Sequence, residues 1–193
     1  MRLAEHMARG LYAAWRLAGF RADGLAFLEP GGRGALRSFS AMLVAAPLYF
    51  TSLWLEARDP GAAAVAATPL SLLLIVYLAG WALFAFLMFH VARMLDLGGG
   101  FPRYLAAHNF CRVMAILAVL PANVILGFGL AHAAVGNLFL LVGGLYVLVL
   151  KGYVARTALG ATTGQAVLLV MFEVVFFFTL ESSVVRAFVP AAG

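Results

Sequence analysis

Glu173 is the acidic residue whose position in the sequence most strongly suggests chemistry. It lies between the apolar pentapeptides LLVMF and VVFFF, eleven residues after Thr162 and near the middle of the last apolar stretch. An intramembrane acid is by default a candidate functional group. Asn123 and Tyr77 are expected at comparable depth, so we predict an intramembrane polar site of Glu173, Asn123 and Tyr77. Either this site titrates protons or cations, or a neutral Glu173 hydrogen-bonds to Asn123 or to a carbonyl freed by Pro121.

A second set of polar side chains flanks the predicted connection between the second and third apolar stretches. The set comprises His90, Arg93, Asp96, Arg103, His108, Asn109 and Arg112. Arginine binds phosphate bidentately, and basic pockets at the cytoplasmic face bind acidic headgroups. We therefore predict a rim of Arg93, Arg103, His108 and Arg112 that binds anionic lipid or a protein partner. The alternative is that these charges only follow the positive-inside rule, with Asp96 neutralising one arginine.

The remaining groups show no pattern typical of catalysis. No HExxH spacing is present, and arginines among the candidate ligands argue against a bound cation. The three glycines at 98–100 are not followed by the Gly-Lys-Ser/Thr of a nucleotide loop. Cys111 is the only cysteine, and Ser182 and Ser183 have no GxSxG context. We therefore predict no catalytic residues, no metal, no cofactor and no enzymatic activity.

The composition indicates which scaffold holds these groups. Of the 193 residues, 65% are hydrophobic and 11% are charged, and the mean hydropathy is +1.02. Soluble domains have about 45–50% apolar and about 25% charged residues, and a soluble fold cannot bury this much apolar surface. The apolar runs are continuous, whereas porin-like strands alternate. The sequence therefore predicts an all-α, polytopic membrane bundle and excludes soluble enzymes and disordered or fibrous chains.

Five membrane-spanning helices follow from the lengths of the uncharged stretches. Each span needs about 20 apolar residues. Residues 113–150 carry no formal charge, and as one helix they would be about 57 Å long. This stretch must therefore turn back, near 131–137. The predicted spans are 36–55, 69–93, 105–130, 137–155 and 162–185.

The positions of the basic residues support this count. With five spans, eleven of the 13 Lys and Arg residues lie on one side, and only Arg58 and Arg186 lie on the other. Positive charge concentrates in cytoplasmic segments. We therefore expect a cytoplasmic N-terminus and an external C-terminus. The net charge of +5 is then explained without a nucleic-acid partner.

The segment before the first span is predicted to form its own helix. At 100° per residue, Arg2, Glu5, Arg9 and Arg16 fall within a sector of about 60°, and apolar residues cover the other side. This amphipathic interfacial helix lies either on the cytoplasmic membrane surface or against the bundle. The predicted division of the chain is 1–34 for this helix and its linker, 35–187 for the five-helix domain and 188–193 for a short external tail.

Three stretches of the chain resemble the Yip1-domain family of integral membrane proteins. They are FLEPGGRGALRSF before the first span, GGGFPRYLAAHNF leading into the third, and YVLVLKGYVARTALGATTGQA between the fourth and fifth. In the last stretch, Leu159-Gly160 and Gln165-Ala166 match the family's glycine-containing loop and Ala-started helix. The likeness covers about 27–186. It implies a bacterial five-helix membrane protein without a catalytic centre. Eukaryotic members act in vesicle traffic with small GTPases, but the short N-terminal segment here lacks their longer cytoplasmic region, so no GTPase partner is expected.

Together these patterns predict a non-enzymatic protein of a bacterial cytoplasmic (inner) membrane. It would act through contacts with membrane lipids, including anionic headgroups, or with another membrane protein or a second copy of itself. No nucleic-acid partner is expected. The alternative is a small transporter or channel subunit in which Glu173 titrates protons or cations.

Overall fold

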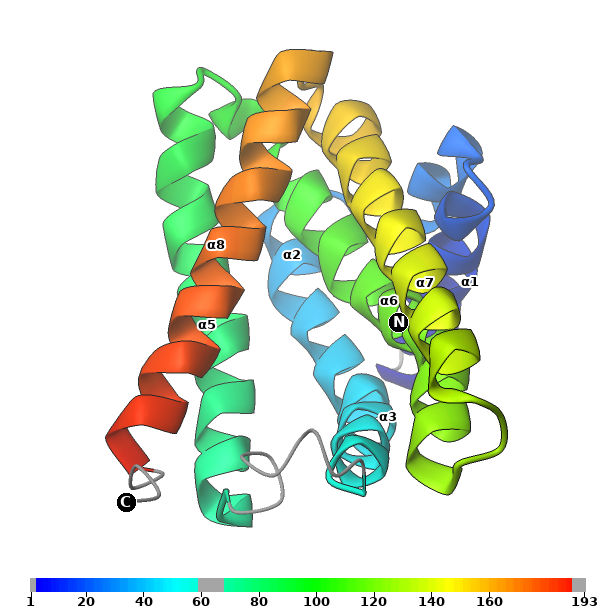
Figure 1. The fold of residues 1–193 in the computed structure, drawn as a ribbon. Coiled ribbons are helices and arrows are strands. Elements are labelled where there is room, and N and C mark those ends of the chain that lie inside the picture. Colours follow the sequence, from blue (N-terminus) through cyan, green and yellow to red (C-terminus); the bar gives the residue numbers. More distant parts are fainter. Residues whose placement is uncertain (1–2, 59–67, 189–193) are drawn as a thin grey trace.

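The computed structural model describes residues 3–58 and 68–188 (Figure 1). Within these ranges the regular structure is helical, without strands, and five helical segments are long and apolar enough to cross a membrane. These segments are Gly31–Glu56, Leu70–Met94, Gly98–Phe128, Ala133–Leu159 and Thr163–Leu180. The predicted all-α membrane bundle is therefore confirmed. Residues 189–193 of the predicted external tail lie outside the described residues.

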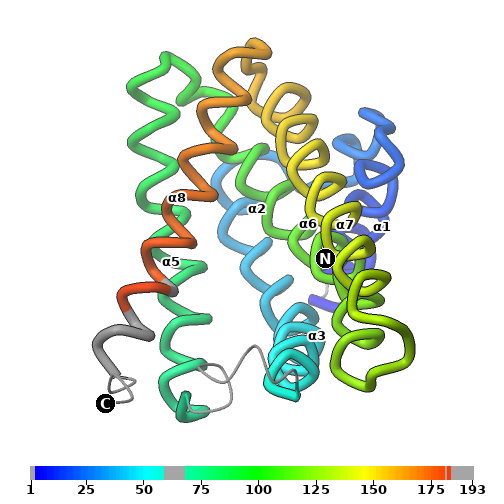
Figure 2. Tube along the Cα trace, in the orientation of Figure 1, coloured from blue at the N-terminus to red at the C-terminus, as the bar shows by residue number. Residues whose placement is uncertain are grey.

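The helices are arranged in two groups around a central gap. In chain order the elements are α1 (Leu3–Ala18), η1 (Ala22–Phe27), α2 (Gly31–Arg37), η2 (Ser38–Ser40), α3 (Ala41–Glu56), α5 (Leu70–Met94), η4 (Gly98–Gly100), α6 (Phe101–Phe128), α7 (Ala133–Val154), the π-helical turn η5 (Ala155–Leu159) and α8 (Thr163–Phe188). Figures 1 and 2 show α5 and α8 side by side, with α1, α6 and α7 across from them and α3 between. We call the end that carries η4, η5 and the start of α8 the basic end, because Arg93, Arg103 and Arg156 lie there.

The third span differs from its predicted range of 105–130. It begins at Phe101, since Pro102 occupies a first-turn position where the missing amide hydrogen is not needed. It ends at Phe128, because Gly129 adopts a left-handed φ of 60°, a conformation that closes a helix and favours glycine. The helix therefore begins about one turn earlier and ends two residues earlier than predicted.

The fourth span begins one turn earlier than its predicted range of 137–155. The side chain of His132 accepts a hydrogen bond from the amide of Ala134 at 3.3 Å and so caps α7 at Ala133. Gly136 and Asn137, which fall in the turn predicted near 131–137, instead lie inside the first turns of the helix. The reversal between the third and fourth spans is therefore confined to 129–132.

The N-terminal helix α1 packs against the bundle. Its buried apolar face consists of Ala13, Ala14 and Leu17, all fully inaccessible. Gly10 packs directly on the ring of Phe110 in α6. Tyr146 of α7 donates a hydrogen bond to the carbonyl of Ala18 at 2.7 Å. Of the two arrangements left open by the sequence, the structure has the helix on the bundle, while Trp15 on the opposite face stays 69% exposed.

Close helix contacts hold α3, α6 and α7 together. A Cβ atom on Gly127 of α6 would lie 2.5 Å from the carbonyl oxygen of Leu55 in α3. A Cβ atom on Gly143 of α7 would lie 2.8 Å from the carbonyl oxygen of Ala118 in α6. Small residues permit such backbone approach inside membranes, where apolar side chains alone give no preference for protein over lipid. These contacts hold α3, α6 and α7 together as one side of the bundle, across from α5 and α8 (Figure 1).

Candidate functional site

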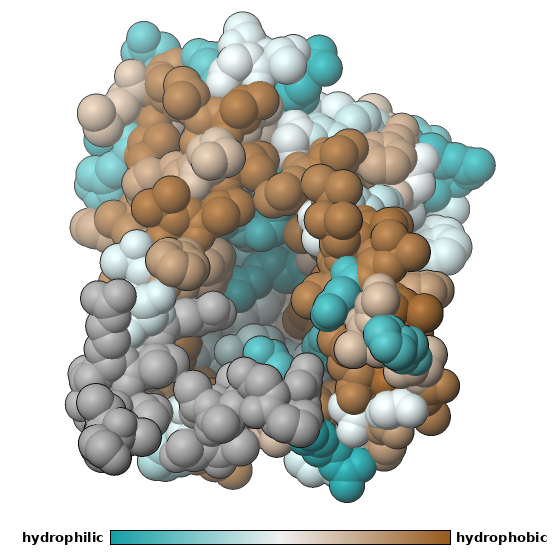
Figure 3. Space-filling model, viewed as in Figure 1, coloured by the Kyte–Doolittle hydropathy of each residue, from teal (hydrophilic) through white to brown (hydrophobic). Residues whose placement is uncertain are grey.

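A cavity of about 890 Å³ lies between α3, α5, α6, α7 and α8. Figure 3 shows it as a hollow between the two helix groups, with hydrophilic residues visible inside. Its walls are mainly apolar, and the polar residues among them are Tyr49, Ser52, Tyr77, Arg112, Asn123, Asn137, Lys151 and Glu173. Binding pockets for small molecules span about 300–1,000 Å³ and combine apolar walls with a few polar groups. The cavity therefore has the size and lining of a ligand site.

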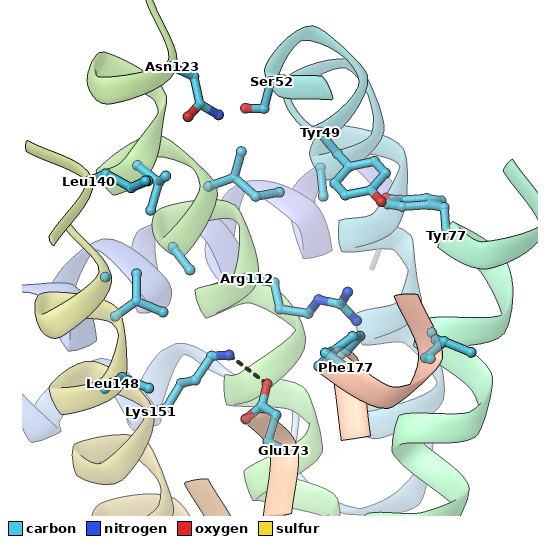
Figure 4. A pocket seen from close by; sticks show the side chains of 18 of the residues that line it. Tyr49, Ser52, Tyr77, Arg112, Asn123, Leu140, Leu148, Lys151, Glu173 and Phe177 are labelled. Atoms are coloured by element: carbon cyan, nitrogen blue, oxygen red, sulfur yellow. Dashed lines mark ion pairs between the residues drawn. The ribbon is translucent and has the colours of Figure 1, made fainter. Parts of the chain in front are cut away.

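Glu173 of α8 forms an ion pair at the basic-end side of this cavity. Its Oε1 atom lies 2.8 Å from the Nζ atom of Lys151, which comes from the last turn of α7 (Figure 4). The Glu173 side chain is 2% exposed and that of Lys151 is 22% exposed. A carboxylate this deeply buried requires a partner to remain ionised. Lys151 supplies that partner from the neighbouring helix.

His108 of α6 lies on the other side of the same carboxylate. Its ring stacks on Phe84 of α5, with centroids 4.1 Å apart and planes inclined by 16°. The Nε2 atom lies 3.6 Å from Oε1 of Glu173, which is too long for a hydrogen bond, and it has no hydrogen-bond partner among the described residues. His108 therefore contacts Glu173 electrostatically and packs as an aromatic ring.

Arg112 supplies a second cation to the cavity. It follows His108 by one helical turn, and its guanidinium carbon lies 4.2 Å from the centroid of the Trp81 ring and 5.2 Å from that of Phe177. Cation–π contacts of this kind hold a charge over an aromatic face. The buried Nη1 atom has no hydrogen-bond partner in the described part of the chain. Arg112 therefore retains an unused donor beside the ion pair.

The cluster has an excess of positive charge. Arg112 and Lys151 contribute two positive charges and Glu173 contributes one negative charge, so with a neutral His108 the sum is one positive charge. Arg112 and Lys151 both line the cavity. An arrangement of this kind attracts an acceptor group, such as a phosphate or carboxylate oxygen. In the parts of the chain that the structure describes, no group of three or more His, Cys, Asp or Glu side chains is placed to hold a metal ion.

The residues predicted as one intramembrane site all line the cavity but occupy different levels. Glu173 lies at the end of the cavity nearer the basic end, and Asn123 lies at the opposite end beside Ser52 (Figure 4). Tyr77 donates its hydroxyl to the carbonyl of Met42 at 2.6 Å. Of the alternatives that the sequence left open, a hydrogen bond between Glu173 and Asn123 is therefore not the one formed here. Eleven residues of α6 separate Arg112 from Asn123, which is about 16 Å along the helix.

A buried hydrogen bond links the charged cluster to the first span. Ser38, seven residues after Gly31, where that span begins, accepts a hydrogen bond from Nδ2 of Asn109 at 2.9 Å. Asn109 adjoins His108, so the first span passes the cluster at Ser38. Glu173 lies ten residues after Thr163 in the last span, Thr163–Leu180, which is near the middle of that span.

The predicted rim of four basic residues is divided by the structure. His108 and Arg112 join the cavity cluster. Arg103 instead donates from Nε to the carbonyl of Ala158 at 3.0 Å, which ties α6 to η5. The guanidinium carbon of Arg93 lies 5.7 Å from the ring centroid of Phe89 on its own helix. The structure thus places only half of the predicted rim at the site.

Lys151 is the site residue that the sequence reasoning missed. In the sequence it is only one of the eleven basic residues on the predicted cytoplasmic side. Two signals pointed to it: it is the only lysine in the chain, and it directly follows the uncharged run 113–150. A lysine at such a boundary can extend its charged group along the helix toward a partner. The buried acid on the next helix is that partner.

These observations define a class: a multi-pass, α-helical membrane-type bundle with a positively charged cavity between its helices. No family model, no curated protein and no solved structure matches the chain. The site must therefore be interpreted from its own geometry and chemistry.

Proposed function

We propose that this protein is a non-enzymatic integral membrane protein that binds an anionic ligand with an apolar body in the cavity between its helices. The observation that carries the proposal is Arg112, a guanidinium inside the bundle whose buried Nη1 atom has no hydrogen-bond partner among the described residues. An unsatisfied donor in a poorly hydrated site is unfavourable. A ligand phosphate or carboxylate would supply the missing acceptor and offset the excess charge of Arg112 and Lys151.

The apolar walls suit the rest of such a ligand. Along α7 the cavity is lined by Leu140, Leu141, Leu145 and Leu148, one face of a single helix. Aliphatic walls bind an apolar body without requiring specific hydrogen bonds. The cavity thus has a cationic end and apolar walls, which match the anionic head and the apolar tail of an amphiphile.

We also propose that the protein resides in a bacterial cytoplasmic membrane with its basic end in the cytoplasm. The strong bias of Lys and Arg toward one side of a five-span chain supports this orientation. The resemblance to the Yip1-domain family supports a non-catalytic role. In this orientation the N-terminus is cytoplasmic and the C-terminus is external.

Native mass spectrometry of the purified protein tests anion binding. Delipidated protein is titrated with phosphatidylglycerol, which is anionic, and with phosphatidylcholine as the zwitterionic comparison. We expect the wild type and Arg93→Gln, a matched loss of charge outside the cavity, to retain phosphatidylglycerol preferentially, and Arg112→Gln to lose that preference. The proposal is contradicted if the wild type retains both lipids equally. It is also contradicted if Arg112→Gln and Arg93→Gln show the same preference for phosphatidylglycerol over phosphatidylcholine.

A second candidate function is proton- or cation-coupled transport. It is favoured by the position of Glu173, whose carboxylate lines the cavity and lies beside Lys151. A carboxylate that gains and loses a proton there would change the charge of the cavity. Proteoliposomes with an imposed pH gradient distinguish the two functions. Transport requires proton flux that Glu173→Gln abolishes, whereas a binding protein shows no flux in either form.

A further inference from the structure

The helices α7 and α8 diverge from the ion pair that joins them. Near the basic end they touch, since a Cβ atom on Gly152 of α7 would lie 4.0 Å from Cγ2 of Val170 in α8. The pair of Lys151 and Glu173 lies at the same level. Away from the basic end the two helices separate, and Figure 1 shows the widening gap between them. The charged cluster therefore lies at the apex of a V-shaped opening.

Side chains on α7 show that this opening is continuous with the cavity. Leu141 and Leu145 line the cavity and are still 60% and 54% exposed, respectively. A Cβ atom on Gly144, between them, would meet no atom within 4 Å. Figure 3 shows the hollow open on the face between α7 and α8. That face lies along the apolar stretches, so the cavity opens toward the hydrocarbon of the bilayer.

From this geometry we infer that the cavity takes an anionic membrane lipid, which enters sideways between α7 and α8 with its phosphate at Arg112 and Lys151 and an acyl chain along α7. The inference rests on the proposed anion-binding function and names the ligand class and its route. Depth supports a lipid over a water-soluble anion. The cluster lies inside the spanning segments, since Glu173 comes ten residues after Thr163, where the last span begins, and Arg112 comes eleven residues after Phe101, where α6 begins. A ligand that enters from the bilayer reaches this level without leaving the membrane, and its chain then extends along α7 in the direction in which α7 and α8 separate.

Trp81 provides a built-in reporter for this lipid. It is 2% exposed, so bulk lipid does not reach its ring, yet it lines the cavity and lies under Arg112. The other two tryptophans, Trp15 and Trp54, are 69% and 53% exposed and can be replaced by phenylalanine. The Trp15→Phe/Trp54→Phe protein then reports fluorescence from the cavity alone.

The experiment reconstitutes this single-tryptophan protein in vesicles that contain lipids with brominated acyl chains, which quench tryptophan on contact. We expect brominated phosphatidylglycerol to quench Trp81 and brominated phosphatidylcholine not to. The additional change Gly144→Leu, which fills the opening, should abolish the quenching. The matched control Gly164→Leu, at an exposed glycine with equally open surroundings at the start of α8, should retain it. Inorganic phosphate added to the water should not displace the lipid.

The outcomes separate this route from the anion site itself. Quenching that persists in Gly144→Leu overturns entry between α7 and α8 and leaves anion binding intact. Displacement by inorganic phosphate overturns the assignment to lipid and favours a water-soluble anion at the same two cations. Equal quenching by both brominated lipids overturns the selection for an anionic headgroup. A loss of quenching in both Gly144→Leu and Gly164→Leu contradicts a role for the opening, because the two glycines differ in whether they border the cavity.

Discussion

The Nζ atom of Lys151 lies 2.8 Å from Oε1 of Glu173, and this contact joins two helices at the point where they begin to separate. The two residues belong to consecutive spans whose connection is short, so the pair closes the basic end of the gap between α7 and α8. The same contact keeps the carboxylate beside Arg112 and His108. This ion pair thus lies where the opening begins and also belongs to the charged cluster of the cavity.

Breaking this pair from its two sides should have unequal effects. Glu173→Gln leaves Lys151 and Arg112 together without a counter-charge, and removing one partner of a buried pair costs about 3–5 kcal/mol. Lys151→Met leaves Glu173 beside Arg112 and should cost less. The double variant Lys151→Met/Glu173→Gln should be more stable than the sum of the single losses predicts. Equilibrium unfolding in mixed micelles measures the three free energies, and strictly additive values would contradict an energetic link between the residues.

Adjacent glycines on α7 provide a matched test of the packing. A methyl group on Gly143 would lie 2.8 Å from the carbonyl oxygen of Ala118, whereas a methyl group on Gly144 would meet nothing within 4 Å. Gly143→Ala should therefore separate α6 from α7 and destabilise the fold by about 1–3 kcal/mol. Gly144→Ala should be neutral or stabilise it by up to about 1 kcal/mol, because alanine is the better helix former. Thermal unfolding of both variants in detergent measures the difference, and equal melting temperatures would show that α6 and α7 do not touch there.

These contacts also explain what could be predicted from the sequence and what could not. The helices were predictable because continuous apolar runs of spanning length have few other structures in a membrane. Glu173 was identifiable because charge is so rare among them. Lys151 stood out as the only lysine of the chain, but its pairing with Glu173 could not be predicted, since α7 is apolar on nearly every side and no hydrophobic face indicates which side meets which neighbour. That choice is made by backbone contacts such as Gly143 on Ala118, which involve residues distant in sequence.

The ion pair between Arg16 and Asp23 should make the end of α1 sensitive to acid. Hydrogen bonds from the Arg16 guanidinium, with Nε 3.1 Å from Oδ1, hold the pKa of Asp23 below its ordinary value. A lowered folded-state pKa stabilises the fold above the ordinary pKa of about 3.9, and that stabilisation is lost as the pH falls through the lowered value. The effect should be small and weakened by salt, because the pair is exposed.

Hydrogen exchange of residues 16–24, corrected for the intrinsic rate at each pH, measures this change. Exchange should quicken as Asp23 is protonated. Asp23→Asn should exchange at the faster rate already at neutral pH and show no further acid step. An acid step of the same size in Asp23→Asn would assign the sensitivity to another group.

The two substitutions that remove the buried hydrogen bond from Asn109 to Ser38 should destabilise the fold by different amounts. Both side chains are essentially inaccessible, at 1% and 0% exposed, and the Ser38 hydroxyl itself donates to the carbonyl of Ala35 at 2.6 Å. Ser38→Ala strands the Asn109 amide, and an unsatisfied buried group costs about 1–3 kcal/mol. Asn109→Leu removes one donor and leaves the Ser38 donor satisfied, so its cost should be nearer the average of about 0.6 kcal/mol for side-chain hydrogen bonds in membrane bundles.

The double variant Ser38→Ala/Asn109→Leu should then be more stable than Ser38→Ala alone, because the stranded amide is gone. Equilibrium unfolding measures the free energy of unfolding of the three variants. A double variant less stable than Ser38→Ala would show that Asn109 contributes mainly by its shape and not by this hydrogen bond.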